Sequence, residues 1–102
     1  MRTKKNIAVY LVKTVEQAKQ VGSVYLRTIH LDTVISFGLP EIDDRYHIWR
    51  LPLLHLEEAV GEVVIDAVTS LLVEAKTTKK QVLEDYLNKM RRIIAEKNKA
   101  VA

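Results

Sequence analysis

The chain has 102 residues, of which 48% are hydrophobic and 28% charged, with three glycines and two prolines. This length and composition predict one globular domain, residues 1–102, and exclude a fibrous or disordered chain. Cysteine is absent, which excludes a disulfide scaffold and any metal site built from thiolates.

The basic N-terminus is followed by a short apolar run, residues 7–12. This run is too short for the hydrophobic region of a signal peptide and fits either a strand or an early helical turn. No stretch of the sequence reaches the roughly 20 apolar residues that cross a bilayer. We therefore expect a cytoplasmic protein that makes no membrane contact.

The first helix signal is a capping box, in which Thr14 is followed three residues later by Gln17. Apolar residues then recur at spacings of three and four, at Ala18, Val21, Tyr25 and Ile29. This spacing places them on one side of a helix. We expect the helix to end at about Thr28.

Two strands are predicted in the middle of the chain. Residues 33–39 are rich in β-branched and aromatic side chains and end at a proline, and the polar residues 40–46 read as a turn. Residues 47–54 form the second strand, with Trp49, Leu51 and Leu53 on one face. Pro52 has no amide donor, so it suits an edge strand or a bulge.

A hairpin is predicted from the next two runs, 61–68 and 71–76. Val63, Ile65 and Ala67 alternate on the apolar face of the first run, and 71, 73 and 75 do so on the second. Thr78 and Gln81 form another capping box, and apolar residues recur at helical spacing up to about Lys97. The expected fold is α+β, an antiparallel sheet of three to four strands covered by an N-terminal and a long C-terminal helix.

One constellation in the hairpin has the residue types of a catalytic site. Asp66 is followed by Glu74 and Lys76 near the end of the second predicted strand. Over residues 58–90 this resembles the core of the PD-(D/E)XK nucleases. The resemblance implies that Asp66 and Glu74 hold Mg²⁺, that Lys76 positions or activates the attacking water, and that Glu58 matches a further acidic residue. Hard oxygen ligands suit Mg²⁺, which stabilises charge on a phosphate.

The hairpin register decides whether that site is geometrically feasible. A three-residue turn places Asp66 opposite Glu74 on one face, whereas a two-residue turn sends the two carboxylates to opposite faces. The segment from Val60 to Glu74 also resembles the strand–turn–strand of PepSY modules, which bind rather than catalyse. A hairpin with solvated charged ends explains the same residues without any cofactor.

The positive charge of the protein is concentrated at one end of the chain. Residues 77–102 hold seven basic and three acidic side chains, whereas residues 1–76 hold nine and ten. Such asymmetry marks either a solvated lysine-rich helix or a surface for nucleic acid or an acidic protein. The candidate contacts are the basic residues of the last helix, Lys89, Arg91, Arg92, Lys97 and Lys99.

The final helix has more apolar positions than a small sheet can cover. We expect Ile93 and Ile94 to lie beyond the sheet, and a symmetric dimer would bury them. The preferred interpretation is a non-enzymatic binding or accessory protein that forms a homodimer and contacts its partner through this helix. The alternative is a minimal metal-dependent nuclease.

His30, His47 and His55 lack the spacing of a zinc site, and we expect ordinary polar roles for them.

Overall fold

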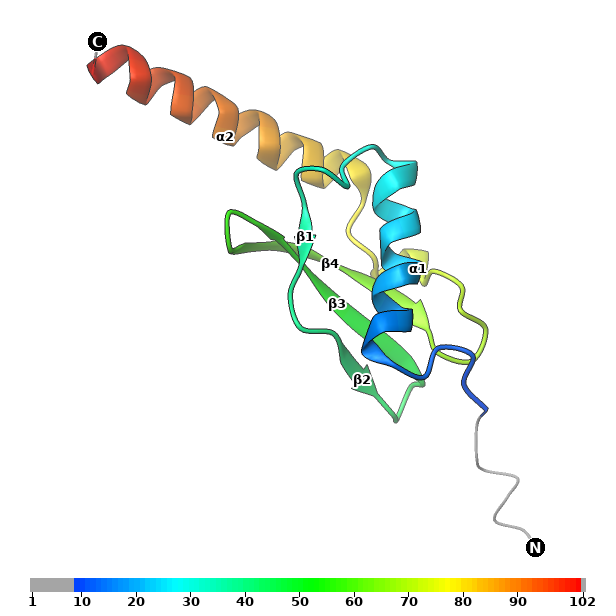
Figure 1. Ribbon diagram of the computed structural model, residues 1–102. Coiled ribbons are helices and arrows are strands. Elements are labelled where there is room, and N and C mark those ends of the chain that lie inside the picture. The colour runs from blue at the N-terminus through cyan, green and yellow to red at the C-terminus, as the bar shows by residue number, and fades with distance from the viewer. Residues whose placement is uncertain (1–8, 102) are drawn as a thin grey trace, which may run out of the picture.

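Figure 1 shows the structure, a computed structural model in which residues 9–101 are described, with side chains described as far as residue 98. The fold is α+β, as predicted, with a four-stranded antiparallel sheet and two helices. None of the helices in the described range is long and apolar enough to cross a membrane.

Helix α1 (Val15–Thr28) begins at the predicted capping box. The Thr14 hydroxyl accepts the amide of Gln17 at 3.1 Å, and the Gln17 side chain accepts the amide of Thr14 at 3.2 Å. These two bonds satisfy amides that the first turn of a helix otherwise leaves unpaired. The predicted start and end of this helix are confirmed.

The sheet is organised around one long central strand, β3 (Ile48–His55). Strand β4 (Glu58–Asp66) pairs with β3 along its whole length. The other edge of β3 pairs with two short strands in succession, β1 (Ser36–Phe37) and β2 (Glu41–Asp43). The sheet is therefore three strands wide, with an interrupted edge on one side.

The interruption between β1 and β2 explains how Pro52 fits in a central strand. Gly38 donates its amide to the carbonyl of Pro52 at 2.9 Å, so the polar groups of Pro52 face this edge. The ladder breaks here, between residues 38 and 40, and the missing amide of proline costs no strand pairing. The predicted strand 33–39 is thus shortened to two residues, and the predicted turn 40–46 contains β2.

The core lies between α1 and one face of β3 and β4. The predicted inward residues of both strands are all buried: Trp49, Leu51, Leu53, Val63, Ile65 and Ala67. Helix α1 approaches this face closely at Gly22, where a Cβ atom would stand 2.8 Å from both Leu51 Cδ2 and Phe37 Cζ. A larger residue here would therefore require the side chains of Leu51 and Phe37 to shift.

The predicted partner of β4 is wrong. Strand β4 pairs with β3 through a tight turn at Leu56 and Glu57, not with residues 71–76. Those residues form a single bridge between Ile65 and Leu72 and then a short 3-10 turn, Glu74–Lys76 (η2). The outer edge of β4 is met by a loop rather than by a strand.

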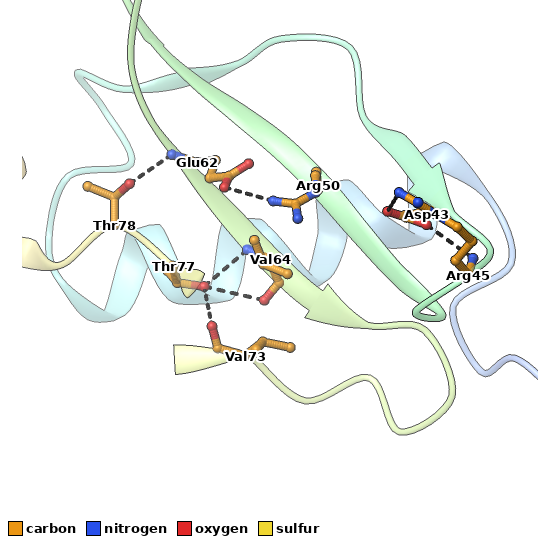
Figure 2. Close-up of polar contacts among 8 residues, drawn as sticks. All are labelled: Asp43, Arg45, Arg50, Glu62, Val64, Val73, Thr77 and Thr78. Atoms are coloured by element: carbon orange, nitrogen blue, oxygen red, sulfur yellow. Dashed lines mark hydrogen bonds and ion pairs between the residues drawn. The ribbon is translucent and has the colours of Figure 1, made fainter. Parts of the chain in front are cut away.

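Two threonine side chains complete this outer edge. Thr78 Oγ1 accepts the amide of Glu62 at 2.9 Å, and Thr77 Oγ1 accepts the amide of Val64 at 3.0 Å (Figure 2). The Thr77 hydroxyl also donates to the carbonyl of Val73 at 2.9 Å. Because these bonds satisfy amides of β4, they hold the chain against the sheet up to the start of the last helix.

Helix α2 (Lys80–Val101) starts beside the body of the protein and then projects away from it (Figure 1). The predicted capping box at its start is wrong, because the Thr78 hydroxyl accepts the amide of Glu62 and Thr78 lies before the first helical bonds, which begin at Lys79.

The N-terminal apolar run, residues 7–12, is predicted to be a strand or an early helical turn. Residues 9–12 form neither, and residues 7 and 8 lie outside the described range.

Candidate functional site: the C-terminal helix

The first two turns of α2 are anchored to the core. Leu83 is completely buried and belongs to the core cluster, and Leu87 packs against that cluster. Burial of a leucine side chain contributes about 1.5–3 kcal/mol. The ring of Tyr86 meets that of His55 edge-to-face, with 5.5 Å between the centroids. The helix therefore has a fixed direction relative to the sheet.

A hydrogen bond from α1 fixes the point where α2 begins. The hydroxyl of Tyr25 donates to the carbonyl of Thr78 at 2.9 Å. Burial raises the pKa of Tyr25, and the negative charge of Glu74 raises it further. The hydroxyl thus keeps its proton, and its role as donor, beyond the usual range of a tyrosine.

Past Met90 the side chains of the helix are exposed, although Arg91 and Ile94 still border a cleft shared with the body. Every side chain from Arg91 to Asn98 is exposed, including the apolar Ile93 at 37% and Ile94 at 47%. The two isoleucines, which the sequence predicted to lie beyond the sheet, are thus only partly covered. We refer to residues 89–98 as the arm (orange in Figure 1).

The predicted basic contacts lie on this arm and point in different directions. Lys89, Arg91, Arg92 and Lys97 are all exposed. Successive residues of a helix are rotated by about 100°, so these four side chains are spread around the circumference rather than gathered on one face. Lys99 lies further along α2, where the structure describes the backbone alone.

The arm carries an excess of positive charge. Glu96 is its one acidic residue. Among the described residues, the one ion pair within α2 joins Lys80 to Glu84 at 3.9 Å, outside the arm, and Arg91 bonds the neutral side chain of Asn88 at 3.1 Å. Cations without an anionic partner are available to an external anion.

A cleft lies where the arm leaves the body. It has a volume of about 380 Å³ and separates α2 from the loop that follows α1. Its lining is mostly apolar and includes three basic side chains, those of His30, His55 and Arg91. The other lining residues are Leu31, Thr33, Val34, Leu87, Met90 and Ile94. Nδ1 of His55 is buried and has no hydrogen-bond partner among the described residues. This cleft could not be predicted from local patterns, because its lining comes from three distant segments.

The residues of the nuclease-like constellation are separated in the structure. The bridge between Ile65 and Leu72, together with the bond from the Asp66 amide to the Leu71 carbonyl at 2.8 Å, places Asp66 opposite Leu71. Glu74 lies beyond this bridge, in η2, and is therefore not paired with β4 across from Asp66. Neither of the two turn lengths considered from the sequence occurs.

Asp66 has a local structural role. Its carboxylate accepts the amides of Val68 at 2.8 Å and Thr69 at 3.0 Å, which closes the turn after β4. Glu74 and Lys76 are exposed on η2. Glu58 begins β4, eight residues from Asp66, which corresponds to about 26 Å along a strand.

No group of three histidine, aspartate or glutamate side chains in the described part of the chain is placed to hold a metal ion.

The face of the sheet opposite α1 carries an ion pair between neighbouring strands. Arg50 Nη1 lies 2.9 Å from Glu62 Oε2, and both side chains are partly exposed (Figure 2).

Sequence reasoning missed the residues that position the arm. Thr77, Thr78 and Tyr25 hold the start of α2 through hydrogen bonds to distant parts of the chain. The pair of adjacent threonines is the one local signal of this role, because threonine hydroxyls can bond to backbone amides.

Comparison with known proteins gives no relative for this chain: no family model, curated protein or solved structure matches it.

Proposed function

We propose that this is a non-catalytic accessory protein that binds double-stranded nucleic acid through the arm of α2. The single observation that carries the proposal is a free, cationic stretch of helix held at a fixed angle to a folded body. Each of Lys89, Arg91 and Lys97 is exposed, and Leu83 anchors the same helix in the core.

The distribution of charge around the arm favours a groove over a flat surface. A helix with its side chains is about 10–12 Å across, close to the about 12 Å width of the major groove of B-DNA. Phosphates flank such a groove on both sides. A helix with cations on several sides, such as Lys89 and Arg91 two residues apart, can contact both strands at once.

The arm is suited to contact phosphates rather than to read bases. Its polar residues are mainly lysine and arginine, and no aromatic side chain follows Tyr86. Lysine and arginine contacts to phosphate position a protein on nucleic acid without reading its sequence. A stacking platform for single strands would need aromatic rings that the arm lacks. We therefore expect binding with little sequence preference and a preference for duplexes.

The test measures binding to a fluorescein-labelled duplex of mixed sequence by fluorescence anisotropy over a series of salt concentrations. With Lys89, Arg91, Arg92 and Lys97 as contacts, neutralisation of about four phosphates gives a slope of log K against log salt of about −3 to −4. Replacement of Arg91 and Arg92 together by alanine should reduce that slope by about 2 and weaken binding at least tenfold at low salt.

The matched control is the double replacement of Lys19 and Arg27 by alanine. Both residues are exposed on α1, outside the arm, and their loss changes the net charge equally. This variant should bind nearly as well as the wild type. Equal weakening by the two double variants, or no binding at low salt, would contradict the proposal. Binding to polyglutamate but not to the duplex would indicate an acidic protein partner.

The nuclease alternative is not carried forward. Asp66 is engaged by the amides of its own turn, and Glu74 lies in the exposed turn η2. The cytoplasm remains the proposed location, as expected from the sequence.

A further inference from the structure

Three residues of the arm form a short line on one side of the helix. Lys89, Ile93 and Glu96 follow one another at spacings of four and three residues, which places them on the same side. All three are exposed, Ile93 at 37%. Neither charged residue of the line forms an ion pair within the described part of the chain.

This line is complementary to itself when it is reversed. Lys89 lies four residues before Ile93, and Glu96 lies three residues after it. A two-fold axis through Ile93 therefore brings Lys89 of one copy opposite Glu96 of the other, and the same pairing is repeated on the far side of the axis. The apolar residue falls at the centre, between two opposite-charge pairs.

We propose that two copies of this protein associate by crossing their arms in antiparallel orientation at Ile93. In that arrangement the two isoleucines bury each other's exposed surface, and each Lys89 meets the Glu96 of the other copy. The partner is a second copy of this chain, chosen by charge complementarity. This proposal does not rest on nucleic-acid binding, because association is measured with the protein alone.

The charges select the antiparallel arrangement over the parallel one. A parallel pair would bring Lys89 beside Lys89 and Glu96 beside Glu96, which is unfavourable on both counts. It would also place both folded bodies at the same end of the helix pair. The antiparallel arrangement places them at opposite ends (compare the position of the body along α2 in Figure 1).

The association is reversible and depends on salt. The arm offers about two to three helical turns per copy, so the contact buries less than the about 1,200 Å² of a stable interface. Exposed ion pairs are screened at an ionic strength of about 0.15 M, where the Debye length is about 8 Å. Arg91, two residues from both Lys89 and Ile93, points away from the contact and takes no part in it.

The test uses sedimentation equilibrium in low salt on two charge-reversed variants, Lys89→Glu and Glu96→Lys. Each variant alone presents like charges at both pairs and should raise the dimer Kd at least tenfold. An equimolar mixture of the two restores opposite charges at both pairs. The mixture should therefore return to the wild-type Kd as a heterodimer, an outcome that a purely local helix effect does not produce.

Two further variants complete the design. Ile93→Asp should abolish the dimer, and Arg91→Glu, with the same charge reversal on the opposite side of the arm, should leave the Kd within about threefold of the wild type. Circular dichroism establishes that each variant is folded. A monomeric wild type at the highest concentration, unchanged dimerisation of the single variants, or a mixture that stays monomeric would overturn the proposal.

Discussion

Thr77 satisfies two backbone groups with a single hydroxyl. It accepts the amide of Val64 at 3.0 Å and donates to the carbonyl of Val73 at 2.9 Å, and its exposed fraction is 7%. Thr77→Val keeps the side-chain shape and leaves the buried amide without a partner. We expect the free energy of unfolding to fall by about 1–3 kcal/mol, as measured by urea denaturation followed by circular dichroism.

Thr69→Val is the matched control for this substitution. Thr69 also accepts a backbone amide, that of Leu71 at 3.2 Å, but the site is exposed. Water replaces the lost hydroxyl there, so the change should be within about 0.5 kcal/mol. If both variants lost the same stability, the outer edge of β4 would not depend on the buried hydroxyl.

Two identical residue patterns show how far local signals reach. Thr14 and Thr78 each precede a glutamine by three residues, yet only Thr14 forms the capping box. The hydroxyl of Thr78 is taken by the amide of Glu62, sixteen residues away. Local sequence describes what a side chain can bind, whereas tertiary contacts decide which partner it has.

The hairpin that joins β3 to β4 has an unfavourable turn. Leu56 and Glu57 have φ angles of 52° and 69°, in the left-handed region that costs a residue with a side chain about 1–2 kcal/mol. A two-residue turn of this kind favours Asn-Gly. The double change Leu56→Asn and Glu57→Gly should therefore raise the free energy of unfolding by about 1 kcal/mol or more, measured by urea denaturation.

Leu39→Asn controls for the removal of an exposed leucine. Leu39 is 74% exposed, compared with 70% for Leu56, and its φ angle is negative. This variant should unfold at nearly the wild-type urea concentration. A gain of similar size at Leu39 would show that surface polarity, rather than turn geometry, accounts for the effect.

The same turn explains why the sequence predicted the wrong strand pairing. The alternation at Val63 and Ile65 correctly identified the core face of β4. However, Leu56 and Glu57 carry no turn signature, and residues 71–76 alternate like a strand. The pairing of β4 with β3 depends on long-range packing that a local pattern does not contain.

The stability of the whole molecule should not depend on the arm. A chain that ends at Ile94 loses only side chains that are exposed or lie beyond residue 98, and it keeps Leu83 and Leu87 in the core. We expect its melting temperature to stay within about 2 °C of the full chain, since surface changes are usually worth less than about 0.5 kcal/mol. Calorimetry measures this.

A chain that ends at Gln81 provides the contrast. It lacks Leu83, which is fully buried, and loss of such a leucine costs about 2–5 kcal/mol. This shorter chain should melt at a clearly lower temperature or fail to fold. A large loss of stability in the chain that ends at Ile94 would show that the arm packs against the body.

The placement of the arm could be predicted only in part. The charge of residues 77–102 and the surplus of apolar positions at Ile93 and Ile94 are visible in the sequence. The direction of α2 is not, because it is decided by the bonds of Thr77 and Thr78 to β4 and of Tyr25 to Thr78. Such contacts between distant segments leave no periodic signal.

The threonine side chains along β4 also affect the tendency of this protein to aggregate at high concentration. An open strand edge offers unpaired amides to any extended peptide and so invites edge-to-edge aggregation. Here Thr78 and Thr77 occupy the amides of Glu62 and Val64, while the loop occupies that of Asp66. Between Glu62 and Asp66 the edge is closed without a further strand, so a foreign chain finds none of these three donors free to begin a fibril.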